Sequence, residues 1–169
     1  MAQPFFMVTS CTLYEGDLLE IVHYVCTDVA TAREAADLID QNPYGEALKA
    51  LLIKVTRYVN CVAKEIVYRR IPNEHAKTNI DNPFWHREPT PSGIYMVVTN
   101  DGGQRIKLLT KNLTLAKRRH SLLLNRWNKG EHDYVELYEV PFNRPSFEGI
   151  PNSWEAFQLS VPPAALDKE

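Results

Sequence analysis

The amino-acid sequence predicts an α+β fold, in which an antiparallel sheet built from β-hairpins is backed by two helices. Three observations lead to this prediction. Short segments rich in β-branched and aromatic residues are paired around turn sequences, as in hairpins. Two other segments carry apolar residues at three- and four-residue spacing, the period of an amphipathic helix. The chain has 169 residues, 44% of them hydrophobic, which suits a single domain with its own core.

The first part of the chain, residues 1–70, is expected to hold a hairpin, a helix and two further strands. Its strands are predicted at residues 5–13, 18–26, 51–59 and 64–70. Residues 14–17, Tyr-Glu-Gly-Asp, have turn chemistry and would close the hairpin. Thr27 and Asp28 can cap a helix over residues 30–41, which Asn42-Pro43 would end or kink.

A proline-rich segment, residues 71–92, separates the two halves and is expected to be a loop. Within it, Phe84, Trp85 and His86 form an aromatic cluster. This cluster could pack on the core as an anchor or be presented outward, where a ring can stack on a base.

The second part, residues 93–140, is expected to repeat the hairpin and helix. Its strands are predicted at residues 93–99, 104–109 and 134–140. Asn100-Asp101-Gly102-Gly103 is a strong hairpin turn, because these residues accept positive φ. Asn112 precedes a helix over residues 113–129, and its expected buried positions are Leu115, Leu122, Leu123 and Trp127. Residues 141–169 form a C-terminal extension expected either to wrap the domain or to be partly mobile.

The two predicted helices begin alike, which suggests a duplicated ββα(β) unit. The residues that match are Val29, Ala32, Arg33, Leu38 and Ile39 with Leu113, Ala116, Lys117, Leu122 and Leu123. Two unrelated amphipathic helices could share the same period. The pattern of residues 93–127, a strand, the Asn-Asp-Gly-Gly turn, a basic strand and a helix, resembles the whirly and PUR-repeat proteins. That resemblance implies binding of single-stranded nucleic acid, although the first half departs from four strands followed by a helix.

Charge is strongly segregated along the chain, although the formal net charge is only -2. Residues 105–130 hold eight basic residues and no acidic one. We call these eight the basic segment: Arg105, Lys107, Lys111, Lys117, Arg118, Arg119, Arg126 and Lys129. Such a local positive field suits a polyanion. Alternatively, it could be neutralised by the acidic residues that follow, especially those of 131–139, or meet an acidic protein partner.

If the ligand is nucleic acid, the basic segment would contact phosphates while Tyr95 and Trp85 would stack on bases. Arg105 and Lys107 alternate with Ile106 and Leu108, so strand alternation places both cations on one face of the sheet. His120 follows three basic residues and is expected to be a surface contact.

The sequence carries none of the common motifs for catalysis, metal binding or cofactor binding. The sequence contains no Cys-x-x-Cys, no His-x-x-x-His, no phosphate-binding glycine loop before a helix and no Gly-x-Ser-x-Gly. The five histidines are scattered, and the carboxylates near the basic segment show no pairing. We therefore expect no enzymatic activity, no metal and no cofactor.

The location of the protein is predicted from three features. The longest apolar runs fall far short of the roughly 20 residues that span a bilayer. The N-terminus lacks the pattern of a secretory signal, and three widely spaced cysteines suit reduced thiols. We expect a cytoplasmic protein with no membrane partner.

The sequence thus favours a non-catalytic protein that binds single-stranded nucleic acid, RNA more readily than DNA. The alternative is a protein–protein interaction factor, such as a viral-type or accessory inhibitor or adaptor. Self-association is a third possibility, since the basic segment of one copy could meet the acidic strand 134–140 of another.

Overall fold

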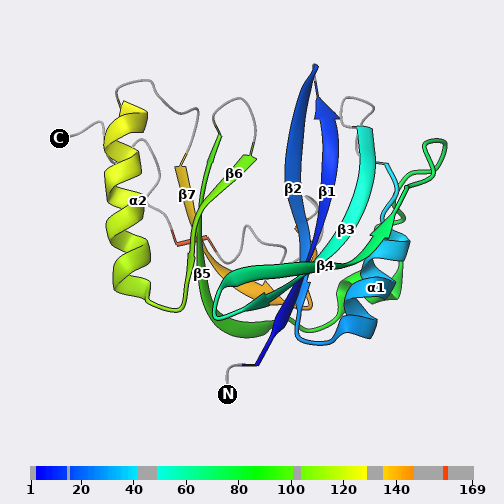
Figure 1. Ribbon diagram of the computed structural model, residues 1–169, viewed down its shortest axis with the longest axis horizontal. Coiled ribbons are helices and arrows are strands. Elements are labelled where there is room, and N and C mark those ends of the chain that lie inside the picture. The colour runs from blue at the N-terminus through cyan, green and yellow to red at the C-terminus, as the bar shows by residue number, and fades with distance from the viewer. Residues whose placement is uncertain are drawn as a thin grey trace.

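The computed structural model describes residues 3–14, 16–41, 49–100, 104–128, 135–146 and 158–159. It contains two antiparallel sheets packed against each other, with one helix on the outer face of each (Figure 1). The order of layers is α1, first sheet, second sheet, α2. The predicted α+β class is confirmed, with the strands divided between two sheets.

The first sheet is formed by the N-terminal half of the chain. Its strands are β1 (Phe5–Tyr14), β2 (Asp17–Cys26), β3 (Lys49–Val59) and β4 (Val62–Arg70), in the spatial order β2-β1-β3-β4. Helix α1 (Val29–Leu38) begins where expected, because an Asp28 carboxylate oxygen accepts the Thr31 N–H at 2.9 Å. It ends earlier than predicted, since Ile39 has extended backbone.

The second sheet has the order β6-β5-β7, with α2 on its outer face. Its elements are β5 (Thr90–Asn100), β6 (Gln104–Thr110), α2 (Leu113–Asn128) and β7 (Val135–Phe142). Asn112 caps α2, as its side-chain oxygen accepts the Leu115 N–H at 3.0 Å. The predicted loop 71–92 contains a short 3-10 helix, η1 (Pro83–His86), and the start of β5.

Both sheets use the same connectivity. In each, a hairpin leads into a helix, and the next strand returns to pair with the first strand of the hairpin, giving β2-β1-β3 and β6-β5-β7. The predicted unit of two strands, a helix and a strand therefore occurs twice as a topology. Duplication of the sequence itself stays a prediction.

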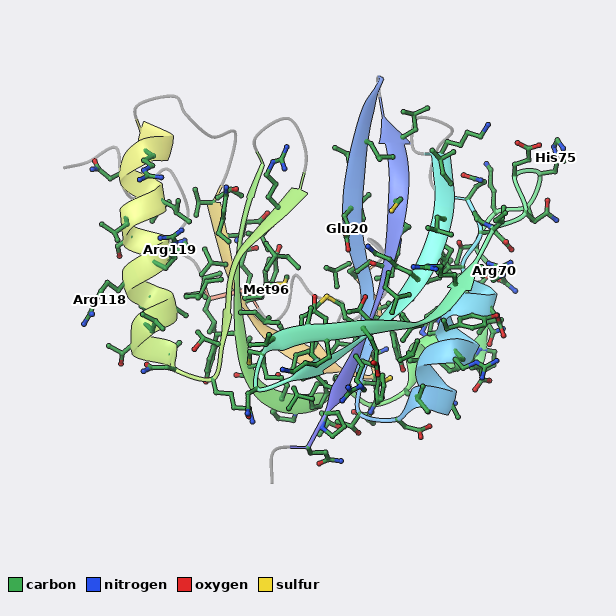
Figure 2. The ribbon with its side chains drawn as sticks, viewed as in Figure 1. Glu20, Arg70, His75, Met96, Arg118 and Arg119 are labelled. Atoms are coloured by element: carbon green, nitrogen blue, oxygen red, sulfur yellow. The ribbon has the colours of Figure 1, made fainter. Side chains whose placement is uncertain are left out.

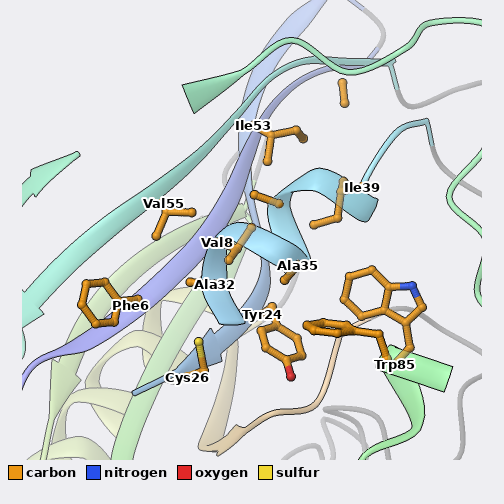
Figure 3. Close-up of a cluster of buried hydrophobic side chains, with 13 residues drawn as sticks. Phe6, Val8, Tyr24, Cys26, Ala32, Ala35, Ile39, Ile53, Val55 and Trp85 are labelled. Carbon is orange, nitrogen blue, oxygen red and sulfur yellow. The ribbon is translucent and has the colours of Figure 1, made fainter. Parts of the chain in front are cut away.

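Aromatic residues of η1 complete the core beneath α1. Trp85 is fully buried and packs edge-on against Phe84 and Tyr24, with ring centroids 5.0 and 5.8 Å away (Figure 3). A buried Arg144 donates from Nη1 to the Trp85 carbonyl at 3.0 Å. Of the two roles considered for the aromatic cluster, Phe84 and Trp85 have the anchoring one, while His86 is exposed.

A second core joins the two sheets face to face. Phe5, Met7, Val22 and Val25 of the first sheet pack with four residues of the second, namely Ile94, Met96, Val98 and Val140. The chain after β7 also borders β2, because the Asn143 N–H donates to the Val25 carbonyl at 2.9 Å. The Ser146 N–H donates to the His23 carbonyl at 3.0 Å. The two halves thus share one core, and residues that follow β7 cover the outer edge of β2.

The buried face of α2 differs from the prediction. Its buried residues are Ala116, His120, Leu123 and Leu124. Leu123 was predicted correctly, whereas Leu115 and Leu122 are 42% and 59% exposed. Because each residue turns the helix by about 100°, a face centred between Ala116 and His120 leaves these two leucines far from the sheet. The Trp127 side chain lies outside what the structure describes.

Candidate nucleic-acid interface

The basic segment lies on the second sheet and its helix. Arg105 and Lys107 belong to β6, and Lys111 lies between β6 and α2. The described cations of α2 are Lys117, Arg118, Arg119 and Arg126, and all four are exposed. Lys129 lies outside the described residues.

Most of these cations have no ionic partner within the described ranges. The ion pairs there involve Lys49, Lys54, Arg57, Arg70 and His75, all of the N-terminal half. Across the same ranges, no ion pair is formed by Arg105, Lys111, Lys117, Arg118, Arg119 or Arg126. Lys49, Lys54, Arg57 and Arg70 of the first half are thus paired with carboxylates, whereas these six cations of the second half are exposed.

The acidic residues 131–139 were considered as ionic partners of the basic segment. For Glu131 and Asp133 this stays a prediction, because both lie outside the described residues. Of the others, Glu136 accepts a hydrogen bond from the Tyr138 hydroxyl and Glu139 is partly buried. Neither forms an ion pair with the exposed cations of α2 in the part of the chain that the structure describes.

The exposed cations of α2 point in several directions. Figure 2 shows Arg118 directed away from the sheet and Arg119 on another side of the helix. This arrangement follows from the helical turn of about 100° per residue, given that Ala116 and His120 face the sheet. The broad basic surface expected from the sequence is therefore spread around α2 rather than gathered on one narrow face.

The cations of β6 line a groove between the two sheets. The groove has a volume of about 600 Å³ and is bordered by Cys11, Leu18, Leu19, Glu20, Tyr58, Arg105, Ile106 and Lys107. Arg105 and Lys107 lie together as expected, but strict alternation is not the reason. The register between β5 and β6 shifts at Val97 and Val98, which leaves Lys107 as the extra residue of a bulge.

The two aromatic candidates are placed differently from the prediction. Trp85 is 0% exposed in the core beneath α1, so its proposed stacking on a base is wrong. Tyr95 is partly buried and packs into the cluster beneath α2. One face of the second sheet packs on α2, and on the other face Ile94, Met96, Val98 and Val140 pack on the first sheet while β6 borders the groove. Within the described residues, both faces of the second sheet are therefore largely occupied, apart from the groove beside β6.

His120 is buried rather than a surface contact. Its 5% exposure places it among the residues of α2 that face the sheet, and burial lowers its pKa. The three basic residues before it made it look like part of the charged surface. His120 faces the sheet because of the way α2 is rotated about its axis, and this rotation is known only once the packing of the helix is seen.

A hydrogen-bonded serine and histidine occur in the first sheet. His23 Nε2 lies 2.7 Å from Ser10 Oγ, which in turn lies 2.6 Å from Thr12 Oγ1. Burial lowers the pKa of His23 to about 4, so its ring is neutral at physiological pH. Ser10 is 0% exposed. The Ser10 hydroxyl therefore has no exposed surface at which a substrate could meet it, while the His23 ring that contacts it is partly buried.

Sequence reasoning missed the part of the groove that the first half supplies. Leu18, Glu20 and Tyr58 lie far from the basic segment in sequence, and only the packing of one sheet on the other brings them near Arg105. Leu18 was one signal in the sequence, because it is a large apolar residue beside the predicted hairpin turn. In the structure its side chain is 66% exposed. No charge or motif marked Glu20.

Further properties limit the chemistry of the described residues. Within them, no helix is long and apolar enough to cross a bilayer, and no three metal-binding side chains converge. Cys11, Cys26 and Cys61 are free thiols.

No protein-family model, curated protein sequence or solved structure matches the chain. The resemblance noted above therefore remains one of pattern.

Proposed function

We propose that the protein binds single-stranded nucleic acid, RNA in preference to DNA, through contacts between its exposed cations and backbone phosphates. The observation that carries the proposal is a set of six exposed cations that have no ion pair within the described ranges, namely Arg105 of β6, Lys111, and Lys117, Arg118, Arg119 and Arg126 of α2. Charged side chains that are not engaged with carboxylates are available to a polyanion, and releasing its counterions favours binding.

The placement of these cations favours a flexible ligand. Arg105 and Lys107 border the inter-sheet groove, whereas Arg118 lies on the outward side of α2. A ligand that touches both must change direction over the surface of the second sheet. Duplex DNA is stiff over about 150 base pairs, so following such a path would require costly bending. A single strand turns at every nucleotide and can follow it.

Charge reversal on α2 tests the proposal. The double variant Arg118→Glu/Arg119→Glu changes two exposed side chains that take no part in the core. The matched control is Lys64→Glu/Arg69→Glu, which alters the net charge equally but on two exposed cations of β4. Fluorescence anisotropy with labelled 20-nucleotide RNA, single-stranded DNA and duplex DNA would measure affinity over a range of salt concentrations.

We expect the α2 variant to bind single-stranded RNA at least about tenfold more weakly at low salt and the β4 variant to bind like wild type. Each phosphate contact contributes about -0.7 to the slope of log affinity against log salt. Losing two contacts should therefore reduce the magnitude of the slope by about 1.4. A slope near zero in the wild type, or equal effects of the two double variants, would refute the phosphate-contact model.

Binding to a protein partner is a second candidate function, favoured by a specific observation. Leu115 and Leu122 are exposed on α2 and lie seven residues apart, two helical turns along one side of the helix. Exposed apolar groups between cations suit a partner that is both apolar and acidic. Leu115→Ser/Leu122→Ser would abolish capture of such a partner and leave oligonucleotide affinity unchanged, which separates the two functions.

A further inference from the structure

The groove between the two sheets combines features of a nucleotide subsite. Its volume of about 600 Å³ falls in the range of pockets that enclose small molecules. Leu18, Leu19 and Ile106 supply apolar surface, and Arg105 and Lys107 supply positive charge on the β6 side. Apolar side chains can pack on the faces of a base while cations hold its phosphate.

Polar groups of the first sheet face the same groove. Glu20 lines it, and its Oε1 lies 3.3 Å from Lys54 Nζ. The Glu20 side chain stays 52% exposed despite this ion pair, so its carboxylate can still accept hydrogen bonds. Tyr58 also lines the groove, with its ring stacked on Phe5 at a centroid distance of 5.0 Å. Burial, and after it the Glu20 charge, raise the pKa of Tyr58, so its hydroxyl stays protonated at neutral pH.

The charges in this region favour an anion with a hydrogen-bond donor. Arg105 is exposed and forms no ion pair within the described residues, so it can hold a phosphate, while the Glu20 carboxylate can accept a hydrogen bond. The cations and the carboxylate come from different sheets, because Arg105 and Lys107 lie on β6 and Glu20 on β2 (Figure 2). A nucleotide has the matching polarity, with a phosphate at one end and a base edge at the other.

We propose that the groove binds one nucleotide of the strand and that Glu20 selects bases with an exocyclic amino group over uracil. Its carboxylate accepts from the N4 amino group of cytosine, as acidic side chains do in base recognition. Uracil presents a carbonyl oxygen at the same position, which the carboxylate repels. The inference rests on the proposed function, because it takes a nucleic-acid strand as the ligand.

Cytosine and uracil oligonucleotides give a matched comparison, since both are pyrimidines of nearly equal size. Anisotropy would measure affinities for labelled 12-nucleotide oligo(C) and oligo(U) at pH 7.5, with wild type, Glu20→Gln and Glu65→Gln. Glu65 is the control because it is also paired with a cation, Arg57 at 2.8 Å, on the same sheet but away from the groove. Thermal unfolding would verify that both variants are folded.

We expect wild type and Glu65→Gln to bind oligo(C) about tenfold more tightly than oligo(U), the effect of one hydrogen bond to a charged group. In Glu20→Gln the ratio should fall to near one, since an amide donates to the uracil carbonyl as well as accepting from cytosine. The ratio is taken within each variant, so a general loss of stability does not change it.

A second measurement locates the ligand. Cys11 lines the groove, whereas Cys61 lies in the turn between β3 and β4, and both thiols are partly buried. We expect oligo(C) to slow alkylation of Cys11 by iodoacetamide, followed by peptide mass spectrometry, and to leave the rate at Cys61 unchanged.

The outcomes separate this inference from the proposed function. Tight, salt-dependent binding with equal affinities for oligo(C) and oligo(U), or without protection of Cys11, would overturn the groove as a base-selective subsite. Phosphate binding by α2 would then stand, and the groove would be left for another occupant. Absence of binding to either oligonucleotide at low salt would overturn the proposed function and this inference with it.

Discussion

Replacing Trp85 tests whether this residue is a core anchor or a ligand contact. Its side chain is 0% exposed and makes edge-on contacts with Phe84 and Tyr24. Truncating a buried tryptophan to alanine typically costs about 3–5 kcal/mol, and each aromatic pair contributes about 0.5–1.5 kcal/mol of such a loss. We expect Trp85→Ala to lower the free energy of unfolding by about 4 kcal/mol, a large share of the 5–15 kcal/mol of a typical domain.

Urea denaturation followed by far-UV circular dichroism would measure the loss. With a urea dependence of about 2 kcal/mol per molar, 4 kcal/mol corresponds to a midpoint lowered by about 2 M. Trp85→Phe retains a ring and should lose less. At a temperature where each variant is folded, affinity for single-stranded RNA should stay within about twofold of wild type. A midpoint nearly equal to wild type together with lost RNA affinity would show that the ring lies on the binding surface.

Two further predictions concern pH and helix capping. The pKa of His23 is about 4 in the folded protein against 6.5 for the free side chain, so only the unfolded chain gains the proton between these values. Stability should therefore fall as pH drops from 6.5 to about 4, by up to about 3 kcal/mol, and urea midpoints at pH 5 and 7.5 should differ less in His23→Gln than in wild type. Removing the cap of α2 in Asn112→Ala should cost about 1 kcal/mol, measured by thermal unfolding. An unchanged melting temperature would contradict that role of the 3.0 Å hydrogen bond to the Leu115 N–H.

Local features of the fold could be predicted from the sequence because they depend on neighbouring residues. The hairpin of β1 and β2, the start of α1 after Asp28 and the start of α2 after Asn112 all lie where turn and capping chemistry placed them. The division of the strands between two sheets could not be predicted in this way. It depends on which apolar faces meet, and Met7 and Met96 belong to strands that are distant in sequence.

The candidate site was predictable in charge but not in shape. The absence of acidic residues from 105 to 130 is visible in the sequence and corresponds to a set of exposed cations. Which face of α2 is buried depends on how the helix packs, and this packing exposes Leu122 and buries His120. Apolar and charged residues are mixed around the helix, so its sequence is compatible with more than one buried face. Trp85 illustrates the same limit, because an aromatic residue in a proline-rich segment suits an anchor and a binding residue equally well until its neighbours are known.

The hydrogen bonds from Asn143 and Ser146 to the edge of β2 have a consequence for synthesis of the protein on the ribosome. Residues 1–70 can form the first sheet early, but the partners of Val25 and His23 lie more than a hundred residues further along the chain. Until they emerge, the nascent first sheet exposes an unpaired strand edge, and Phe5 and Met7 lack the second sheet that covers them. Chains that terminate before residue 143 should therefore aggregate or recruit chaperones, even though their first sheet is complete.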